Sequence, residues 1–151
     1  SSMGAWWALR FTDTLQRSQQ LWPAALLLLA PAVDFTHELL LKKLPQALLD
    51  QLEQQGTTAI PSQYEEAPLK FYKQFIEDAN HHRLLNRSSD ITVPMTMIHG
   101  EQDTDIPLIL TIKAAAHFKN TQLITVNDGE HRLSREQDIQ LILKTLEDLQ
   151  S

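Results

Sequence analysis

Residues 93–126 read VPMTMIHGEQDTDIPLILTIKAAAHFKNTQLITV, and this stretch decides the fold. Residues 93–99 are an apolar run of strand length, and the polar segment 101–107 that follows predicts a loop. Residues 107–119 place apolar side chains at helical spacing, and residues 122–126 predict a second strand. Because strands that alternate with helices are typical of a parallel sheet covered by helices, we expect an α/β fold.

The segments on both sides extend this alternation. Residues 3–19 predict a helix, because Trp7 and Phe11 belong to one apolar stripe with a spacing of four residues. Residues 24–30 (AALLLLA) predict a strand buried on both faces, with a short buried helix as the alternative. Residues 134–149 predict a last helix with one apolar face. The expected architecture is therefore a three-layer αβα arrangement around a parallel sheet.

An insert of mostly helical character, residues 34–87, separates the first predicted strand from the second. Leucines recur at roughly helical spacing over residues 35–55, with an interruption at Pro45. Residues 68–85 predict another helix. We expect the insert to form a helical cap on a single domain that comprises residues 1–151.

The composition restricts the classes of function. The chain of 151 residues has a net charge of -6 and no long basic block, which argues against nucleic acid as a partner. Its longest apolar run, residues 21–33, is broken by Pro23 and Pro31 and is too short to span a bilayer. The absence of cysteine excludes disulfides and a thiolate nucleophile and fits a reducing compartment, so we expect a cytoplasmic location.

The first four residues, SSMG, match the end of a nucleophile elbow, whose pattern is G-x-S-x-G. Placing the central serine on Ser2 puts Gly4 at the fifth position, whereas Ser1 lies one residue too far from Gly4. A helix that starts directly after the serine exposes the hydroxyl and stabilises negative charge beside it. The pattern predicts Ser2 as a nucleophile and the Met3 backbone N–H as one oxyanion donor, with a second donor upstream.

Two further residues complete a candidate catalytic set. Asp103 follows the strand predicted over 93–99, and His131 follows the strand predicted over 122–126. Because the carboxyl ends of parallel strands share one edge of a sheet, loops after different strands can bring such residues together. A neutral histidine activates a serine hydroxyl, and a carboxylate orients the imidazole and stabilises its protonated form. Asp105 is an alternative to Asp103 as the acid.

These loops resemble those of the α/β-hydrolase family, in which the catalytic residues follow in the order Ser, Asp, His. The sequence HGEQD at 99–103, followed by Pro107, is similar to the family's HGxxDxxxP acid loop and favours Asp103 over Asp105. The sequence EHR around His131 is similar to its histidine loop. The resemblance covers essentially the whole chain, taken as the C-terminal portion of such a domain.

The stretches PSQYEE at 61–66, FIEDANHHRLL at 75–85 and HRLSREQDIQLI at 131–142 resemble the branch of acyl-glucuronide esterases and palmitoyl-protein thioesterases. This resemblance implies cleavage of carboxylic esters or acyl thioesters through an acyl-enzyme, without a metal or an organic cofactor. The adjacent pair His81 and His82 does not change that expectation, because neighbouring residues point to different sides of a helix.

Two alternatives remain open for the function. The chain could belong to a lid-bearing hydrolase of another substrate class, such as a peptidase or a C–C hydrolase, or to a non-catalytic scaffold that binds a ligand or another protein. In each case we expect the chain to need the missing N-terminal half of the same fold. Without it, the strand over 24–30 would present an apolar edge that favours aggregation.

Overall fold

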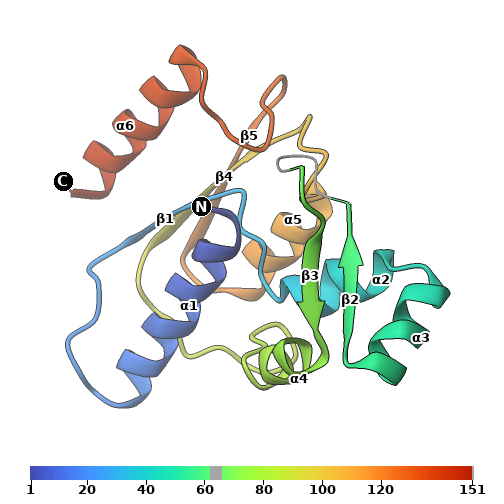
Figure 1. Ribbon diagram of the computed structural model, residues 1–151. Helices are drawn as coiled ribbons and strands as arrows, with labels where there is room; N and C mark the ends of the chain where they lie inside the picture. The colour runs from blue at the N-terminus through green and yellow to red at the C-terminus, as the bar shows by residue number, and fades with distance from the viewer. Residues whose placement is uncertain (62–65, 151) are drawn as a thin grey trace. The chain divides into compact units, whose positions relative to one another are not determined.

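A computed structural model describes residues 1–61 and 66–150, which divide into two units (Figure 1). The sheet unit comprises residues 1–33 and 84–150, and the insert unit comprises Asp34–Arg83. Residues 62–65, within the PSQYEE stretch, and residue 151 lie outside the described residues.

The sheet unit is built on three parallel strands in the order β1-β4-β5. Leu29 of β1 lies opposite Ile98 of β4, and Gly100 of β4 lies opposite Val126 of β5. The three carboxyl ends therefore share one edge of the sheet, and all six residues of the central strand β4 are buried. The strands are β1 (Leu26–Leu29), β4 (Met95–Gly100) and β5 (Thr121–Val126).

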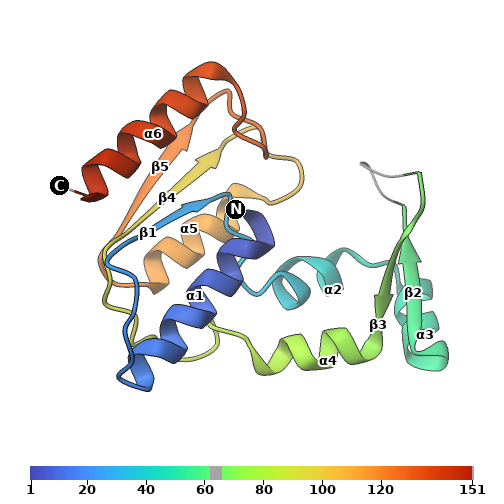
Figure 2. The ribbon, with the colours of Figure 1, turned by 60° about the vertical axis from the view of Figure 1, so that its left-hand side comes forward.

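Helices cover both faces of this sheet. Figure 2 shows α6 (Glu136–Gln150) on one face and both α1 (Ser2–Arg17) and α5 (Leu108–His117) on the other. Helix α1 buries Trp6 and Leu9 among the residues that pack it onto the sheet unit. The α/β class with a parallel sheet in three layers is confirmed, and each predicted helix and strand of the sheet unit agrees with the structure to within two or three residues.

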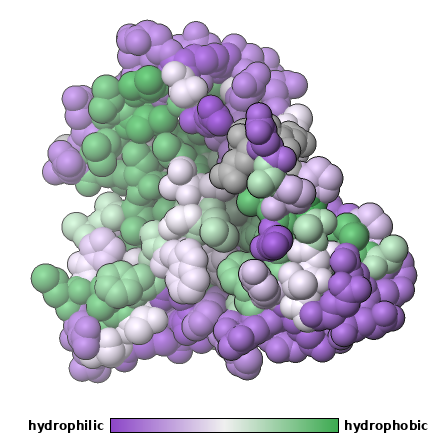
Figure 3. All heavy atoms as spheres, in the orientation of Figure 1, coloured by the Kyte–Doolittle hydropathy of each residue, from purple (hydrophilic) through white to green (hydrophobic). Residues whose placement is uncertain are grey.

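Strand β1 differs from the prediction in its burial. Residues 26–29 form a strand and not a short helix, but only Leu26 and Leu28 are buried, whereas Leu27 and Leu29 are half-buried. Within the part of the chain that the structure describes, β1 pairs with β4 alone, so its second edge has no neighbour. Figure 3 shows hydrophobic side chains gathered over the strands between α6 and α1. All four residues of β1 are therefore apolar, although two of them are only half-buried.

The insert unit has its own small core. Leu40, Leu44, Leu52 and Ile76 are buried together in it. A left-handed glycine, Gly56 with φ 71°, ends helix α3 and turns the chain into a hairpin. Its elements are the π-helical turn η1 (Thr36–Leu40), α2 (Leu41–Lys43), α3 (Gln46–Gln55), β2 (Thr57–Ile60), β3 (Leu69–Tyr72) and α4 (Lys73–His81).

The predicted helix over residues 68–85 is wrong in its first part. Residues 69–72 are strand β3, antiparallel to β2, and helix α4 begins only at Lys73. The sequence LKFY alternates apolar and polar side chains, and the β-branched segment TTAI opposite it favours strand pairing. The insert is helical in most of its remaining elements, and its role as a cap stays a prediction.

A buried carboxylate ties α1 to the chain segment before β4. Asp13 is almost completely buried, and Arg10, Arg17 and Arg87 each place a guanidinium nitrogen within 3.1 Å of its oxygens. Arg87 lies 74 residues further along the chain and approaches to 2.6 Å, so this contact joins two distant segments of the sheet unit. Burial of the charge requires these donors, because an unpaired buried carboxylate is costly.

We predict that Asp13→Asn lowers the free energy of unfolding by about 2 kcal/mol, since three charge-assisted hydrogen bonds lose their charged acceptor. Urea unfolding followed by circular dichroism measures the change. Asp90→Asn is the matched control, because the Asp90 side chain is 62% exposed and its ion pair with Arg17 lies at the surface. An equal loss in both variants would contradict the account.

Candidate active site

The loops after β4 and β5 meet through two glycines. A Cβ built on Gly100 would lie 2.2 Å from the carbonyl oxygen of Gly129, so any side chain at position 100 would collide with the backbone of the other loop. The backbone N–H of Glu101 donates to the Val126 carbonyl at 2.9 Å, and the N–H of Gln102 donates to the Gly129 carbonyl at 2.9 Å. The absence of side chains at both glycines therefore allows the two loops to be joined backbone to backbone.

Asp103 is placed by its own loop. Its Oδ1 accepts the backbone N–H groups of Asp105 and Ile106, each at 2.9 Å, which is the pattern of an Asx turn. Its Oδ2 accepts a hydrogen bond from His131 Nδ1 at 2.7 Å, a length typical of a charge-assisted contact. The Asp103 side chain is fully buried, whereas the His131 side chain is 21% exposed.

The contact with Asp103 fixes the useful nitrogen of His131. Because a carboxylate only accepts, Nδ1 carries the hydrogen, and in the neutral imidazole the lone pair is then on Nε2. Nε2 makes no hydrogen bond within the residues described. This arrangement leaves Nε2 available to take a proton from a nucleophile or a water molecule.

Ser2 begins helix α1 in a strained conformation. Its φ is +50°, which is uncommon for a residue other than glycine and is typical of a nucleophile elbow. Its carbonyl oxygen accepts the N–H of Ala32 at 3.1 Å, so the start of α1 lies beside the chain that leaves the carboxyl end of β1. Met3 is in the first turn of α1, where backbone N–H groups have no partner inside the helix.

The structure thus joins Asp103 and His131 by a direct hydrogen bond, and among the described residues no hydrogen bond links Ser2 to either of them. In the described part of the chain, the Ser2 hydroxyl makes no hydrogen bond. Asp105 donates its backbone N–H to Asp103 Oδ1, and a carboxylate oxygen of Asp105 lies within 4.8 Å of a His131 ring nitrogen. The catalytic roles of Ser2, Asp103 and His131, and of the Met3 N–H, stay predictions.

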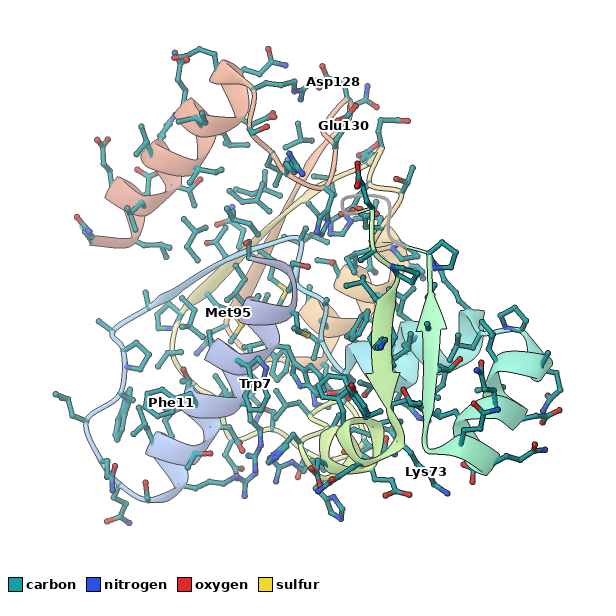
Figure 4. The ribbon with its side chains drawn as sticks, in the orientation of Figure 1. Trp7, Phe11, Lys73, Met95, Asp128 and Glu130 are labelled. Carbon is teal, nitrogen blue, oxygen red and sulfur yellow. The ribbon has the colours of Figure 1, made fainter. Side chains whose placement is uncertain are left out.

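Sequence reasoning missed the residues that hold the histidine loop. Arg135, between that loop and α6, binds the Asp128 carboxylate at 2.6 and 3.0 Å and the Asp138 carboxylate at 2.8 and 2.9 Å. The Asp138 side chain is almost fully buried and also accepts the Arg135 backbone N–H at 3.2 Å. Figure 4 shows Asp128 and Glu130 on this loop. The sequence held one signal for these contacts: Arg135 has an aspartate seven residues before it and another three residues after it.

These contacts change the proton affinities of the groups involved. Hydrogen bonds from Arg135 lower the pKa of Asp138 and of Asp128 below the usual value for an aspartate. Hydrogen bonds to Asp138 and Asp128 in turn raise the pKa of the Arg135 guanidinium. All three groups are therefore charged at neutral pH, and the loop that carries His131 is fixed to α6 by ion pairs.

The side chains of Asp103, Asp105 and His131 also place ligand atoms within 4.8 Å of one another, a spacing that could hold a metal ion. Both Asp103 oxygens, however, already accept hydrogen bonds from backbone N–H groups or from His131. The arrangement is therefore better suited to orienting an imidazole than to binding a cation.

No helix among the described residues is long and apolar enough to cross a membrane.

No protein-family model matches the chain. Among curated proteins, the mitochondrial palmitoyl-protein thioesterase ABHD10 of Homo sapiens and that of Pongo abelii are each 30% identical to it over 152 residues. The alignments cover 99% of this chain and 48% of each relative. The chain therefore spans about half the length of the curated relatives it matches.

Two solved structures are also similar. A putative hydrolase from Agrobacterium vitis S4 superposes with a TM-score of 0.90 at 30% identity, over 99% of this chain and 59% of that one. The alpha/beta hydrolase domain-containing protein 10 from mouse gives a TM-score of 0.83 at 27% identity, with the same coverage. Both solved chains extend well beyond the part that superposes.

We predict that Gly100→Ala lowers the free energy of unfolding by about 2 kcal/mol or more, because the new Cβ collides with backbone that cannot move freely. Chemical denaturation monitored by fluorescence measures the loss. Gly4→Ala is the matched control: apart from its chain neighbours and its own helix backbone, no described atom lies within 4 Å of its Cβ position, and alanine is favoured over glycine within a helix. A tolerated Gly100→Ala would show that the loops are not held by this close approach.

We also predict a pH-dependent cost for Asp138→Asn. Because the folded pKa of Asp138 is lowered, its contribution to stability is complete above the unfolded value of about 3.9 and is lost as the pH falls through the folded value. The difference in unfolding free energy between wild type and variant should therefore shrink below about pH 4. Urea titrations at pH 7, 5 and 3 measure it, and a difference that stays constant would refute the assignment.

Proposed function

We propose that this chain, which has an α/β-hydrolase fold, belongs to a serine hydrolase that cleaves carboxylic esters or acyl thioesters through an acyl-enzyme. The observation that carries the proposal is the 2.7 Å hydrogen bond between the buried Asp103 carboxylate and His131 Nδ1. It joins two loops that are 28 residues apart and leaves Nε2 available as a base.

The proposed reaction uses His131 twice. Ser2 Oγ attacks the carbonyl carbon of the substrate and gives its proton to His131 Nε2. The imidazolium then protonates the oxygen or sulfur of the leaving group, and the acyl group stays on Ser2. A water molecule attacks this acyl-enzyme by the same route, which releases the carboxylic acid and restores the serine hydroxyl.

The negative charge that develops on the substrate oxygen needs hydrogen-bond donors. The first turn of α1 offers the Met3 N–H next to Ser2, at the positive end of the helix dipole. One such donor contributes on the order of 3 kcal/mol to lowering the barrier. A second donor would come from a segment outside this chain.

The substrate class rests on similarity. The curated relatives are named palmitoyl-protein thioesterases, and at 30% identity over 99% of this chain they support an ester or thioester as substrate. The insert unit Asp34–Arg83 is proposed to be the cap of this enzyme, with an apolar core of its own. The compartment stays a prediction, because the lack of cysteine fits the cytoplasm while the names of the relatives place those proteins in mitochondria.

The rest of the domain is the proposed partner of the sheet unit. Strand β1 has one edge without a neighbour among the residues described, and the relatives are about twice as long as the chain. Apolar side chains of the sheet unit remain exposed, including Phe11 at 64% and Leu21 at 94%. Figure 4 shows Trp7 and Phe11 along α1. A segment that adds a parallel strand to β1 and covers these side chains would complete the core.

We predict that a fluorophosphonate probe labels the complete protein on Ser2 and that Ser2→Ala abolishes both labelling and hydrolysis, because no other group is proposed to form the acyl-enzyme. Mass spectrometry of the labelled peptide identifies the serine. Ser1→Ala is the matched control and should keep both properties.

The acid is tested by a second pair of variants. Asp103→Asn should lower kcat by about 10³-fold or more, since the amide no longer stabilises the imidazolium, whereas Asp105→Asn should have a small effect. A folded, complete protein that reacts with neither probe nor ester would instead be a binding scaffold. Efficient turnover of a peptide or a C–C substrate, without ester cleavage, would assign another hydrolase class.

A further inference from the structure

The loop that carries His131 is closed on itself by one ion pair. Residues 127–135 connect β5 to α6, with Asp128 near the start of this loop and Arg135 at its end. The Arg135 guanidinium donates to both carboxylate oxygens of Asp128, at 2.6 and 3.0 Å. His131 lies between the two partners along the chain. The ion pair therefore joins the two ends of the segment from which the imidazole extends.

Helix α6 orients the guanidinium for this contact. Asp138, in the first turn of α6, accepts the Arg135 backbone N–H at 3.2 Å, as the third helical residue does in a capping box. It also accepts Nε and one Nη of Arg135, at 2.9 and 2.8 Å. The Asp138 side chain is 2% exposed, whereas the Asp128 side chain is 63% exposed. Because Asp138 already fixes the guanidinium, pairing with Asp128 costs less side-chain entropy than an ordinary surface ion pair does.

The loop needs this closure because its backbone is strained close to His131. Leu133 has a φ of +46°, a left-handed conformation that is unfavourable for a bulky residue, and it is 3% exposed. Such a conformation persists only where the surrounding structure holds it. The first part of the loop is held against the acid loop by the hydrogen bond that the Gly129 carbonyl accepts. The part around Leu133 is held from the other end, by the ion pair, and its relaxation would move the imidazole away from Asp103.

We propose that Asp128 and Arg135 are positioning residues: their ion pair holds the His131 imidazole in place against its carboxylate partner. Asp138 has a different task, because it anchors Arg135 to the start of α6. The effect of the ion pair on catalysis rests on the function proposed above. Its effect on the contact between Asp103 and His131 does not.

Asp128→Ala in the complete protein tests the proposal, because it removes the exposed partner and leaves Arg135 on Asp138. The downfield signal of the proton between His131 and Asp103 reports their contact, and we expect this signal to weaken. We expect kcat to fall about fivefold with KM unchanged, the factor that corresponds to the upper range for an exposed ion pair. The free energy of unfolding should fall by less than in Asp138→Asn, because Asp138 is buried.

Two variants separate the ion pair from net charge. Glu130, labelled beside Asp128 in Figure 4, has an exposed side chain for which the described residues offer no hydrogen bond or ion pair. Glu130→Ala removes a negative charge next to His131 and should keep the signal and the kcat of the wild type. Asp128→Glu retains a carboxylate for Arg135 and should keep most of both.

Three results would overturn the proposal. The first is an Asp128→Ala protein with the wild-type His131 signal, or with a raised KM and an unchanged kcat. The second is a Glu130→Ala protein with the same losses as Asp128→Ala, which would assign the effect to net charge. The third is an Asp128→Glu protein that behaves like Asp128→Ala.

The spectra do not depend on the identity of the nucleophile. If Ser2 failed to react with the probe while Asp128→Ala still weakened the His131 signal, the proposed function would fail and the positioning role would stand. If Ser2 reacted and the His131 signal were insensitive to Asp128, the reverse would hold. Amide spectra of each variant confirm that it is folded before the histidine signals are compared.

Discussion

The contact that the candidate site depends on is the approach of two backbones, at Gly100 and Gly129. Parallel strands β4 and β5 end in register at Gly100 and Val126, and the chain after each strand must turn without separating from the other. With no Cβ at Gly100, the two loops come close enough for the N–H groups of Glu101 and Gln102 to reach carbonyl oxygens of the histidine loop. This close approach of the two backbones brings Asp103 next to His131.

The Asp103 carboxylate and the His131 imidazole have different surroundings. The Asp103 side chain has no exposed surface, and its oxygens accept hydrogen bonds from two backbone N–H groups and from the His131 ring, while the His131 side chain is partly exposed. Arg135 fixes the histidine loop to α6 through two aspartates. His131 is thus held on both sides, by one hydrogen bond at Nδ1 and by ion pairs further along its loop, while Nε2 makes no hydrogen bond among the described residues.

The order of helices and strands in the sheet unit was predictable, because each segment has a clear apolar period and the segments alternate. The insert was harder: residues 69–72 continue into a helix along the chain, and only pairing with residues 57–60 makes them a strand. The pairing of Asp103 with His131 was predictable from the positions of their loops and from the HGEQD motif. The roles of Arg135 and of the second glycine were not predictable, since each depends on a partner brought near by the fold.

The central claim is that Ser2, His131 and Asp103 act as one proton-transfer unit. A crystal structure of the complete protein, after reaction with a fluorophosphonate, tests it most directly. The account predicts a covalent adduct on Ser2 Oγ with His131 Nε2 about 3 Å from that oxygen, and the 2.7 Å contact between His131 Nδ1 and Asp103 retained. An adduct on a different residue, or a His131 ring outside hydrogen-bonding reach of Ser2, would contradict it.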